Sequence, residues 1–522
     1  MASNQHVTVS LGAVAQSRAP VRARDPRTNR TALLAGIFAV VFCAAGSWIP
    51  SFWGDEAASI MSAERPLPSL FRMLGNVDAV HGTYYLMLHF WIEVFGASAL
   101  SVRFPSAIAA GLIVAGTVVL AERLASYRVA VFAGLVCLLF PRITFMGAEA
   151  RSYALSAACA VWLTVVFVGL IARRDRRILP WAAYAALLAV TGYVFLFAML
   201  IVVAHLAILL TVSRDHWMRR TWLLSVAIAL ALTAPVIFYA VAERNQIKYL
   251  SVRDALTPWN LLVVQWFGNV VYAAFAWALV VAAALIAWRM RREGRTLRRL
   301  SLPLVAACWA LIPTIILVAA NGIHSVYSAR YLSFAAPGAV LLIAWMLSRI
   351  PGTMRLRLPL RSSRIRRMPV AVAALIALLL AAAPTYVLQR GPYSENNSDW
   401  AQVSATVGSH AKPGDAIVFD ESTIPSLRLR LAMHVYPQDY VGLDDVMLRV
   451  PFTDNTWWWD KLDTLKSVSG RLDAVGRVWV LEYRAPGEPT DRYGMADLRG
   501  LGFRVTHSYP EHASTVYELQ RS

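Results

Sequence analysis

The sequence predicts a polytopic α-helical membrane protein that ends in a small extracytoplasmic α/β domain, and three observations support this. Of the 522 residues, 58% are hydrophobic and only 16% are charged, with a mean hydropathy of +0.51. Apolar runs of about 20 residues recur along the chain, and each is long enough to cross a bilayer as a helix. After residue 389 the composition changes to that of a soluble domain.

The net charge of +19 would suit a nucleic-acid-binding protein, but its distribution argues against one. The arginines cluster in short segments between apolar runs, as the positive-inside rule expects of cytoplasmic loops. The four cysteines, Cys43, Cys137, Cys159 and Cys308, all lie inside apolar runs. We therefore interpret them as small core residues rather than as disulfide partners or metal ligands.

Residues 1–30 are polar and rich in arginine, so we expect a cytoplasmic tail of low order. The first span, 31–50, runs outward and leads into a first outer loop, 51–103. Within this loop, Thr83–Phe95 is apolar over 13 residues, which is short for a span. We expect it to lie in the membrane interface as a helix, because a crossing would place Arg123, Arg128 and every later arginine cluster on the wrong side.

The remaining apolar runs alternate in direction, in agreement with the arginine clusters, and give eleven spans within a transmembrane domain of residues 31–389. The amino terminus is then cytoplasmic and the carboxyl terminus extracytoplasmic. After the first span, the expected spans are Phe104–Ala121, Val129–Phe145, Ala154–Ala172, two within Leu179–Val212, Leu223–Val241, Val270–Trp288, Leu302–Ala320, Leu332–Leu347 and Val370–Leu388.

Residues 390–522 form the predicted extracytoplasmic α/β domain. Its size lies within the usual range for a domain. Turn residues and short apolar runs indicate strands at Ala416–Asp420, Val478–Leu481, Phe503–His507 and Thr515–Leu519, and helices at Asp399–Val407 and Ala496–Leu501.

Two adjacent carboxylates follow the first span, in Trp53-Gly54-Asp55-Glu56. Charged side chains beside a bilayer are costly, so they indicate a functional site by default. The other outward loops add Glu149 and Arg151 after the third span, and Arg330 after the ninth. We expect these groups to converge on one outer cavity.

That set of groups suits sugar transfer from a lipid phosphate. The acceptor hydroxyl loses a proton as it attacks the anomeric carbon, and Asp55 could accept that proton as a general base. The leaving phosphate gains charge, which arginine stabilises well through its planar fork of donors. A base on one side and cations on the other describe a single displacement with inversion, whereas a retaining mechanism needs two carboxylates flanking the bond.

Each group also has a structural interpretation. Asp55 and Glu56 could cap an interfacial helix, and Glu149 with Arg151 could form an ion pair without a catalytic role. The remaining polar groups at the outer face have similar alternatives, in which His81 and His89 are hydrogen-bonded interfacial residues and Arg330-Tyr331 is a membrane anchor.

Four segments of the sequence resemble the GT-C glycosyltransferases, and among them the bacterial relatives of protein O-mannosyltransferases and of the aminoarabinose transferase that modifies lipid A. The first three cover roughly the first third of the chain. The segments are Trp53-Gly54-Asp55-Glu56-Ala57, His81-Gly82-Thr83-Tyr84-Tyr85-Leu86 running on to Arg103-Phe104-Pro105-Ser106, Gly147-Ala148-Glu149-Ala150-Arg151-Ser152-Tyr153-Ala154-Leu155, and Ser328-Ala329-Arg330-Tyr331-Leu332.

The resemblance implies the GT-C fold, a polyprenyl-phosphate sugar donor and inverting transfer outside the cytoplasmic membrane, with Asp55 as the base. Two departures leave the acceptor open: Gly82-Thr83 stands where many relatives have prolines, and Glu149 stands where the lipid A enzyme type has an aspartate. We expect Asp55 and Glu56 to be catalytic, and the donor and its phosphate to be bound by Arg151, Arg330, His81, Tyr153, Glu149, Lys248, Tyr331 and His324.

The leading hypothesis is therefore a membrane glycosyltransferase that moves a sugar to a cell-envelope acceptor, namely a glycolipid, a lipoglycan or a secreted protein. Mannose is the first choice of sugar by family analogy alone. No cofactor is assigned, and participation of a divalent metal stays open. The alternatives are a transporter or flippase for lipid-linked sugars, which would place charges near mid-bilayer, and a non-catalytic envelope-assembly protein.

The predicted topology can be tested with reporter fusions. Seven arginines lie between Arg349 and Arg367, just before the last span. We expect a reporter that is active only outside the cytoplasm to be active after Arg390 and inactive between Arg349 and Arg367. The opposite pattern would overturn the span count and the outward placement of Asp55.

Overall fold

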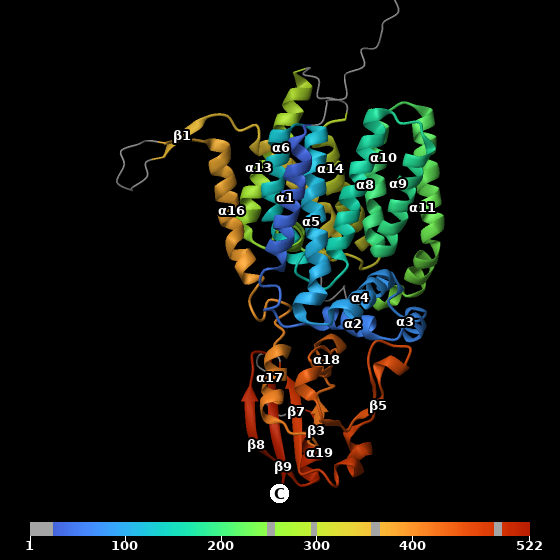
Figure 1. The fold of residues 1–522 in the computed structure, drawn as a ribbon, viewed down its shortest axis with the longest axis vertical. Helices are drawn as coiled ribbons and strands as arrows, with labels where there is room; N and C mark the ends of the chain where they lie inside the picture. The colour runs from blue at the N-terminus through green and yellow to red at the C-terminus, as the bar shows by residue number, and fades with distance from the viewer. Residues whose placement is uncertain (1–24, 248–255, 294–299, 357–365, 485–492) are drawn as a thin grey trace, which may run out of the picture.

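The computed structural model describes residues 25–247, 256–293, 300–356, 366–484 and 493–522. Most of the predicted amino-terminal tail lies outside the described residues, as does Lys248. The described chain forms a bundle of long helices with a smaller mixed region at one end (Figure 1).

The bundle consists of roughly parallel helices (Figure 1). Apolar residues surround most of these helices on all sides, as is typical of helices that are buried or face lipid. Their bounds are α1 Arg27–Ala44, α5 Ala99–Leu124, α6 Tyr127–Leu138, α8 Tyr153–Arg173, α9 Ile178–Val194, α10 Ile201–Val212, α11 His216–Ala242, α13 Val270–Arg292, α14 Leu302–Asn321, α15 Ala336–Leu347 and α16 Val370–Leu388.

Each expected span overlaps one of these helices, and the pair expected within Leu179–Val212 appears as α9 and α10 joined by the 3₁₀ turn η2 (Leu196–Leu200). Among the described residues, seven helices are long and apolar enough to cross a membrane, and three apolar stretches are shorter. The protein is thus a polytopic α-helical membrane protein, while the count of eleven spans stays a prediction.

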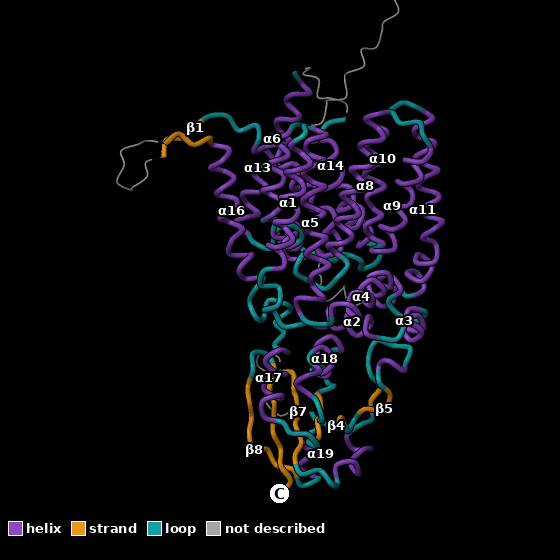
Figure 2. Tube along the Cα trace, viewed as in Figure 1, coloured by secondary structure: helices purple, strands orange, loops and turns teal. Residues whose placement is uncertain are grey.

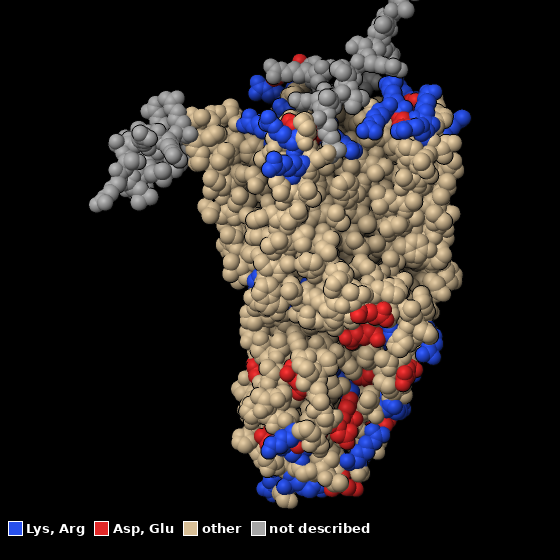
Figure 3. All heavy atoms as spheres, in the orientation of Figure 1, with Lys and Arg blue, Asp and Glu red and all other residues tan. Residues whose placement is uncertain are grey.

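Charged residues divide the surface into zones (Figure 3). Lys and Arg gather at one end of the bundle, a belt with almost no charged residues follows, and both signs appear beyond it on the smaller region. The hairpin of β1 (Thr353–Leu356) and β2 (Arg366–Pro369) lies at the basic end. The end of the bundle opposite the basic end is called the site end below.

Three short helices lie across the site end of the bundle. They are α2 (Gly54–Glu64), α3 (Leu67–Leu74) and α4 (Gly82–Phe95), with the 3₁₀ turn η1 (Ala79–His81) before α4. The segment predicted to lie in the interface is thus α4, which packs against α2 beneath the bundle. Smaller elements complete this end: α7 (Pro141–Met146), η3 (Arg244–Ile247), the π-helical turn η4 (Asn260–Val264) and η5 (Ala329–Ala335).

Residues 391–522, called the C-terminal region, contain a five-stranded sheet in the order β4-β3-β7-β9-β8. Its strands are drawn in orange in Figure 2. β3 pairs in parallel with β4 and β7, whereas β9 pairs antiparallel with β7 and β8. The strands are β3 Ala416–Phe419, β4 Asp444–Asp445, β7 Arg477–Tyr483, β8 Phe503–Pro510 and β9 Ser514–Arg521, and a separate hairpin joins β5 Leu448–Val450 and β6 Lys461–Leu462.

The helices of this region are short. They are α17 Trp400–His410, α18 Arg430–Val435 and α19 Met495–Gly500, with 3₁₀ turns η6 Pro425–Leu427, η7 Pro437–Tyr440, η8 Phe452–Asp454 and η9 Leu465–Leu472. All four expected strands and both expected helices therefore occur, within a few residues of their expected bounds.

One hydrophobic core joins the C-terminal region to the helices at the site end. It contains Phe52, Ile60 and Met61 from the first loop together with Trp400 and Phe419 from the C-terminal region. A second core fills the bundle, and a third lies on the other face of the sheet. The first outer loop is therefore packed as part of the C-terminal region, although the two are far apart in sequence.

A directed chain of hydrogen bonds crosses the bundle through His205 on α10. The Trp222 indole N–H donates to the Tyr184 hydroxyl (3.2 Å), which lies 2.9 Å from His205 Nδ1. His205 Nε2 lies 3.2 Å from Thr164 Oγ1, and that hydroxyl donates to the Ala160 carbonyl (2.8 Å). These partners place the His205 proton on Nε2 and link α11, α9, α10 and α8 inside an apolar environment, where an unpaired polar group is costly.

We expect Tyr184→Phe to destabilise the bundle, because it leaves the Trp222 N–H and His205 Nδ1 without partners. Hydrogen bonds between membrane helices are worth about 1 kcal/mol, so thermal unfolding of the detergent-solubilised protein should shift down by a few degrees. Tyr239→Phe, at a half-exposed ring on α11, is the matched control. Equal melting temperatures for the two variants would show that these hydrogen bonds add nothing to the stability of the bundle.

Candidate functional site

A buried ion pair between Glu56 on α2 and Arg103 on α5 organises the site end. Arg103 Nε donates to Glu56 Oε1 (2.7 Å) and a terminal nitrogen donates to Oε2 (2.5 Å), and both side chains are fully buried. Arg103 also donates to the carbonyls of Ser47 (2.5 Å) and Pro50 (2.9 Å), while Glu56 Oε1 accepts from the Ala150 N–H (2.8 Å). One pair thus ties together the end of α1, the start of α2 and the loop before α8.

Asp55, the neighbour of Glu56, points to a different partner. Adjacent residues on a helix are about 100° apart, so the two carboxylates diverge. Asp55 Oδ2 accepts from Arg330 on η5 (2.8 Å), and its side chain is 20% exposed. The Arg330 guanidinium also lies over the Trp53 ring, 5.0 Å from its centroid. A second acid, Glu149, places its Oε1 3.8 Å from Arg330. Asp55 is therefore the more accessible of the two acids.

Arg151 is fixed beside Asp55 by three contacts. One terminal nitrogen donates to the Asp55 carbonyl (3.1 Å) and to Ser59 Oγ (3.2 Å), and the other lies 3.2 Å from His81 Nε2. Because a guanidinium can only donate, His81 accepts through Nε2 and is neutral. Burial, together with the charge of Arg151, holds the pKa of His81 well below its ordinary value.

Asp78 continues this cluster behind His81. The Tyr85 hydroxyl donates to its carboxylate, and burial raises the pKa of Asp78 to about 7. The Ala79 N–H donates to Glu243 at the end of α11 (3.2 Å), and the Asp78 N–H donates to Gln246 (3.3 Å). The loop after α11 therefore holds the η1 turn that carries His81.

Glu149 is the most unusual group of the site. It is fully buried, and neither carboxylate oxygen has a hydrogen-bond partner among the described residues. Its ion-pair partner is Arg330 rather than Arg151, so the ion pair considered from the sequence does not form. Burial raises the pKa of Glu149 to about 7, and burial with the charge of Glu56 raises the pKa of Glu395 well above its ordinary value.

Aromatic rings form a wall around the cations. Arg330 lies over the rings of Trp53 (5.0 Å) and Tyr153 (5.9 Å), and Tyr331 stacks on Phe197 (5.0 Å). Rings beneath a guanidinium add cation–π attraction and restrict its orientation. Arg330 is therefore held in place by packing as well as by charge.

The structure brings together most of the residues expected from the sequence, namely Asp55, His81, Glu149, Arg151, Tyr153, Arg330 and Tyr331. Glu56 is next to them but is engaged with Arg103. His324 is exposed, and its side chain has no hydrogen bond or ion pair within the described chain, while Lys248 lies outside it. Asp78 and Glu395 were not predicted, because each is a single acid in an otherwise ordinary loop.

A metal does not fit this donor set. Nowhere in the described part of the chain do three or more His, Cys, Asp or Glu side chains form a group that could hold a metal ion. The acids at the site are instead opposed by arginines, which repel a cation. No step proposed below involves a metal.

An apolar groove lies between α13, α14 and α15 within the bundle. It encloses about 320 Å³ and is lined by Trp266, Trp277 and Trp288 with small and aliphatic residues around them. Next to Trp266, the Gln265 side chain accepts from the Tyr327 hydroxyl (3.2 Å), three residues before Arg330. The groove thus runs between membrane helices, and its lining residue Trp266 directly follows Gln265, which contacts Tyr327. Its apolar lining suits a lipid chain.

The C-terminal region covers the start of α2. A Cβ atom on Gly54 would lie 2.3 Å from the Ser426 carbonyl oxygen of η6, so only glycine fits there. The Phe52 N–H donates to the Tyr436 hydroxyl (2.9 Å). Arg65 at the other end of α2 is fully buried and donates to the Asn455 carbonyl (3.0 Å). These contacts hold α2, and with it Asp55, against the C-terminal region.

Comparison with known proteins supports the architecture. Residues 83–239 match the family described as dolichyl-phosphate-mannose-protein mannosyltransferase. No curated protein matches the chain significantly. Among solved structures, ArnT from Cupriavidus metallidurans bound to undecaprenyl phosphate superimposes with a TM-score of 0.56 at 15% identity, over 93% of this chain and 97% of ArnT.

Two further structures are similar. The apo state of the same ArnT gives a TM-score of 0.55 at 14% identity, with the same coverage of both chains. The oligosaccharyltransferase AglB from Archaeoglobus fulgidus gives 0.47 at 11% identity, over 94% of this chain and 74% of AglB. The likeness to ArnT extends over nearly the whole of both chains, and the protein has the GT-C fold.

We expect Gly54→Ala to destabilise the contact between α2 and η6. The new methyl group would overlap backbone atoms of Ser426, and forcing a carbon into a packed site typically costs about 1–3 kcal/mol. Gly500→Ala is the matched control, because a Cβ atom there meets nothing within 4 Å. The melting temperature should be lower for Gly54→Ala and unchanged for Gly500→Ala. An unchanged melting temperature for Gly54→Ala would contradict the close contact.

Proposed function

We propose that the protein is an inverting glycosyltransferase that moves a sugar from a polyprenyl-phosphate donor to a hydroxyl of an acceptor. The observation that carries this proposal is the pairing of an accessible carboxylate, Asp55, with Arg330, while Arg151 lies directly beside them. An accessible base and guanidinium groups in one site supply the two functions that such a displacement needs, namely a proton acceptor for the attacking hydroxyl and cations for the leaving phosphate.

The comparisons support a lipid-phosphate donor. ArnT, which shares the fold, was solved with undecaprenyl phosphate, and the family matched over residues 83–239 is named for dolichyl-phosphate-mannose. The apolar groove between α13, α14 and α15 offers a place for the lipid chain of such a donor. Its phosphate would then meet Arg330 and Arg151.

In the proposed step, the acceptor oxygen attacks the anomeric carbon of the donor sugar and its proton passes to Asp55. The bond between the anomeric carbon and the phosphate oxygen breaks, and its electron pair stays on the phosphate. Arg330 and Arg151 stabilise that charge through charge-assisted hydrogen bonds. One displacement with one base inverts the anomeric configuration.

The ion pair with Arg330 also controls how readily Asp55 accepts a proton. A carboxylate that is bound to a guanidinium is a weak proton acceptor, because the opposite charge stabilises the ionised form. The donor phosphate carries negative charge and competes for the same guanidinium. Binding of the donor thus releases Asp55 from Arg330 and makes it basic when the substrate is in place.

Glu56, in this proposal, positions α2 through Arg103 instead of exchanging protons. His81, Tyr153, Tyr331 and Glu149 shape the donor pocket around Arg151 and Arg330. We propose mannose as the sugar and a glycolipid, lipoglycan or secreted protein of the cell envelope as the acceptor. Transfer would take place at the outer face of the cytoplasmic membrane, with residues 31–389 as the transmembrane domain and 390–522 as an extracytoplasmic domain.

The proposed base can be tested with Asp55→Asn, which keeps the size of the side chain but cannot accept a proton. General-base catalysis is worth about 10²- to 10⁴-fold, so kcat should fall at least about 100-fold. Binding of polyprenyl phosphate should persist, because the arginines remain. The assay uses purified protein with radiolabelled polyprenyl-phosphate sugars and envelope extracts.

Glu56→Gln is the comparison at the neighbouring acid. It leaves the fully buried Arg103 without its counter-charge, which is strongly destabilising. This variant should therefore melt at a lower temperature than Asp55→Asn, because Asp55 is partly exposed and Arg330 keeps Glu149 beside it. Full transfer by Asp55→Asn would remove Asp55 from the reaction. If the parent protein moves lipid-linked sugars across the membrane of a vesicle but transfers no sugar to an acceptor, the transporter alternative would be established instead.

A further inference from the structure

Arg142 on α7 is a buried cation that has no part in the reaction proposed above. Its side chain belongs to a residue that is only 8% exposed. Nε donates to the Gln265 carbonyl (2.9 Å), and one terminal nitrogen donates to the Val264 carbonyl. Both acceptors are neutral backbone groups at the end of η4. These contacts hold the guanidinium in place but do not balance its charge.

The other terminal nitrogen of Arg142 is free to bind a ligand. It makes no hydrogen bond or ion pair within the described part of the chain, and it is not fully closed off from solvent. Glu149 acts on Arg142 at longer range, but it is already the ion-pair partner of Arg330. Buried charges are normally paired, because removing an ion from water is costly. The unmatched guanidinium therefore indicates that an anion binds here.

The position of Arg142 relates the apolar groove to the charged site. Trp266, which lines the groove, directly follows Gln265, whose carbonyl accepts from Arg142. Both α7 and η4 pack against η5, the element that carries Arg330. Arg142 interacts electrostatically with Arg330 and with Glu149. Its guanidinium thus lies between the backbone that leads into the groove and the groups around Asp55.

A lipid phosphate matches both sides of this junction. Its apolar chain suits the groove, and its anionic end suits the cations beside it. Arg142 and Arg330 carry like charges and repel each other, so an anion bound to both relieves that repulsion. The separate oxygens of one phosphate can accept hydrogen bonds from two guanidinium groups at once.

We propose that Arg142 binds the phosphate of the lipid donor together with Arg330, as a further residue of the phosphate site. The identity of the anion rests on the proposed function, whereas the requirement for an anion comes from the unmatched charge of Arg142. The phosphate gains negative charge when the sugar leaves. Arg142 should therefore bind the released polyprenyl phosphate at least as tightly as the donor.

Binding can be measured by titration calorimetry on the full-length, detergent-solubilised protein, without any transfer reaction. The probes are farnesyl phosphate, a short polyprenyl phosphate, and farnesol, which has the same chain without the phosphate. We expect the parent protein to bind farnesyl phosphate about tenfold or more tightly than farnesol. Equal affinities would overturn the lipid-phosphate donor of the proposed function, and the role of Arg142 with it.

With that preference established in the parent, variants test Arg142 alone. Arg142→Gln should weaken binding of farnesyl phosphate by about tenfold, because a hydrogen bond to a charged group is lost, and should leave farnesol binding unchanged. Arg142→Lys keeps the positive charge and should retain part of the affinity. Unchanged binding of farnesyl phosphate by Arg142→Gln would overturn the proposal. An equal loss for both probes in both variants would show that Arg142 only shapes the groove, and would also overturn it.

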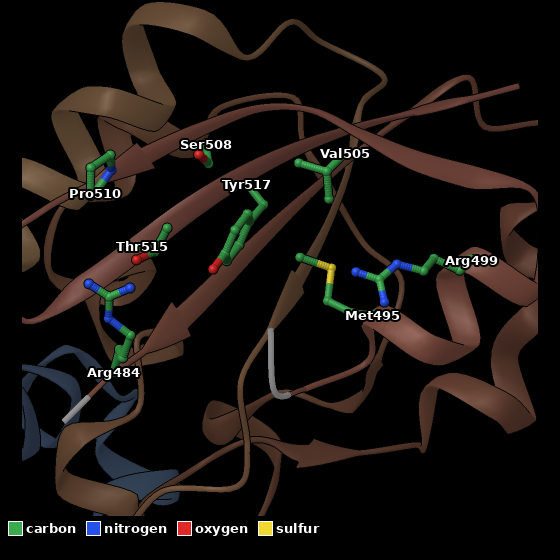
Figure 4. A pocket seen from close by; sticks show the side chains of 8 residues that line it. All are labelled: Arg484, Met495, Arg499, Val505, Ser508, Pro510, Thr515 and Tyr517. Atoms are coloured by element: carbon green, nitrogen blue, oxygen red, sulfur yellow. The ribbon is translucent and has the colours of Figure 1, made fainter. Parts of the chain in front are cut away.

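Two arginines outside the site serve as matched controls. Arg123 in the last turn of α5 also donates to a backbone carbonyl, that of Val165 (2.7 Å). Arg484 lines a separate cavity of about 480 Å³ in the C-terminal region (Figure 4). Arg123→Gln and Arg484→Gln should bind farnesyl phosphate as the parent protein does. If either control loses as much affinity as Arg142→Gln, the phosphate is not located by Arg142 and the proposal fails.

Discussion

The buried pair of Glu56 and Arg103 is the interaction on which the rest of the site end depends. Burying two charges is expensive, and only close geometry with further hydrogen bonds repays that cost. Arg103 meets this condition by bonding the carbonyls that follow α1, and Glu56 does so by accepting the Ala150 N–H. The pair therefore fixes the relative positions of three segments, and those segments carry Asp55, Glu149 and Arg151. Without it, the groups proposed to react would belong to independent loops.

Much of the fold follows from local properties of the sequence. Runs such as Ala154–Ala172 are apolar all round and long enough for a span, so α8 was predictable from length and hydropathy alone. The prediction that the segment now seen as α4 lies in the membrane interface came from its short length together with the arginines after it. The arrangement of the helices in the bundle was not predictable, because it depends on side-chain packing between elements, such as the path from Trp222 to Thr164 through His205.

The part of the candidate site that could be predicted from the sequence consists of charged residues beside the apolar spans. Asp55, Arg151 and Arg330 stand out because charged groups beside a bilayer are costly, and because the expected alternation of spans places all three on the side opposite the arginine clusters. Asp78 carries no such signal, since its role depends on Tyr85 and on hydrogen bonds from its turn to the loop after α11. Gly54 stood in the motif, but the reason for a glycine is the Ser426 carbonyl, nearly four hundred residues later. Contacts at that separation leave no local pattern.

That separation has a consequence for the biosynthesis of the protein. The first outer loop is made early, yet Phe52 bonds Tyr436 and Arg65 bonds the Asn455 carbonyl, at separations of 384 and 390 residues. A ribosome adding about 5–20 residues per second needs roughly 20–80 seconds to cover that distance. During this interval α2 lacks the surface that holds it, so a nascent chain already inserted in the membrane has no assembled site. The proposed reaction therefore becomes possible only after the C-terminal region has been made and has packed against α2, so we expect the nascent protein to be inactive during its insertion into the bilayer.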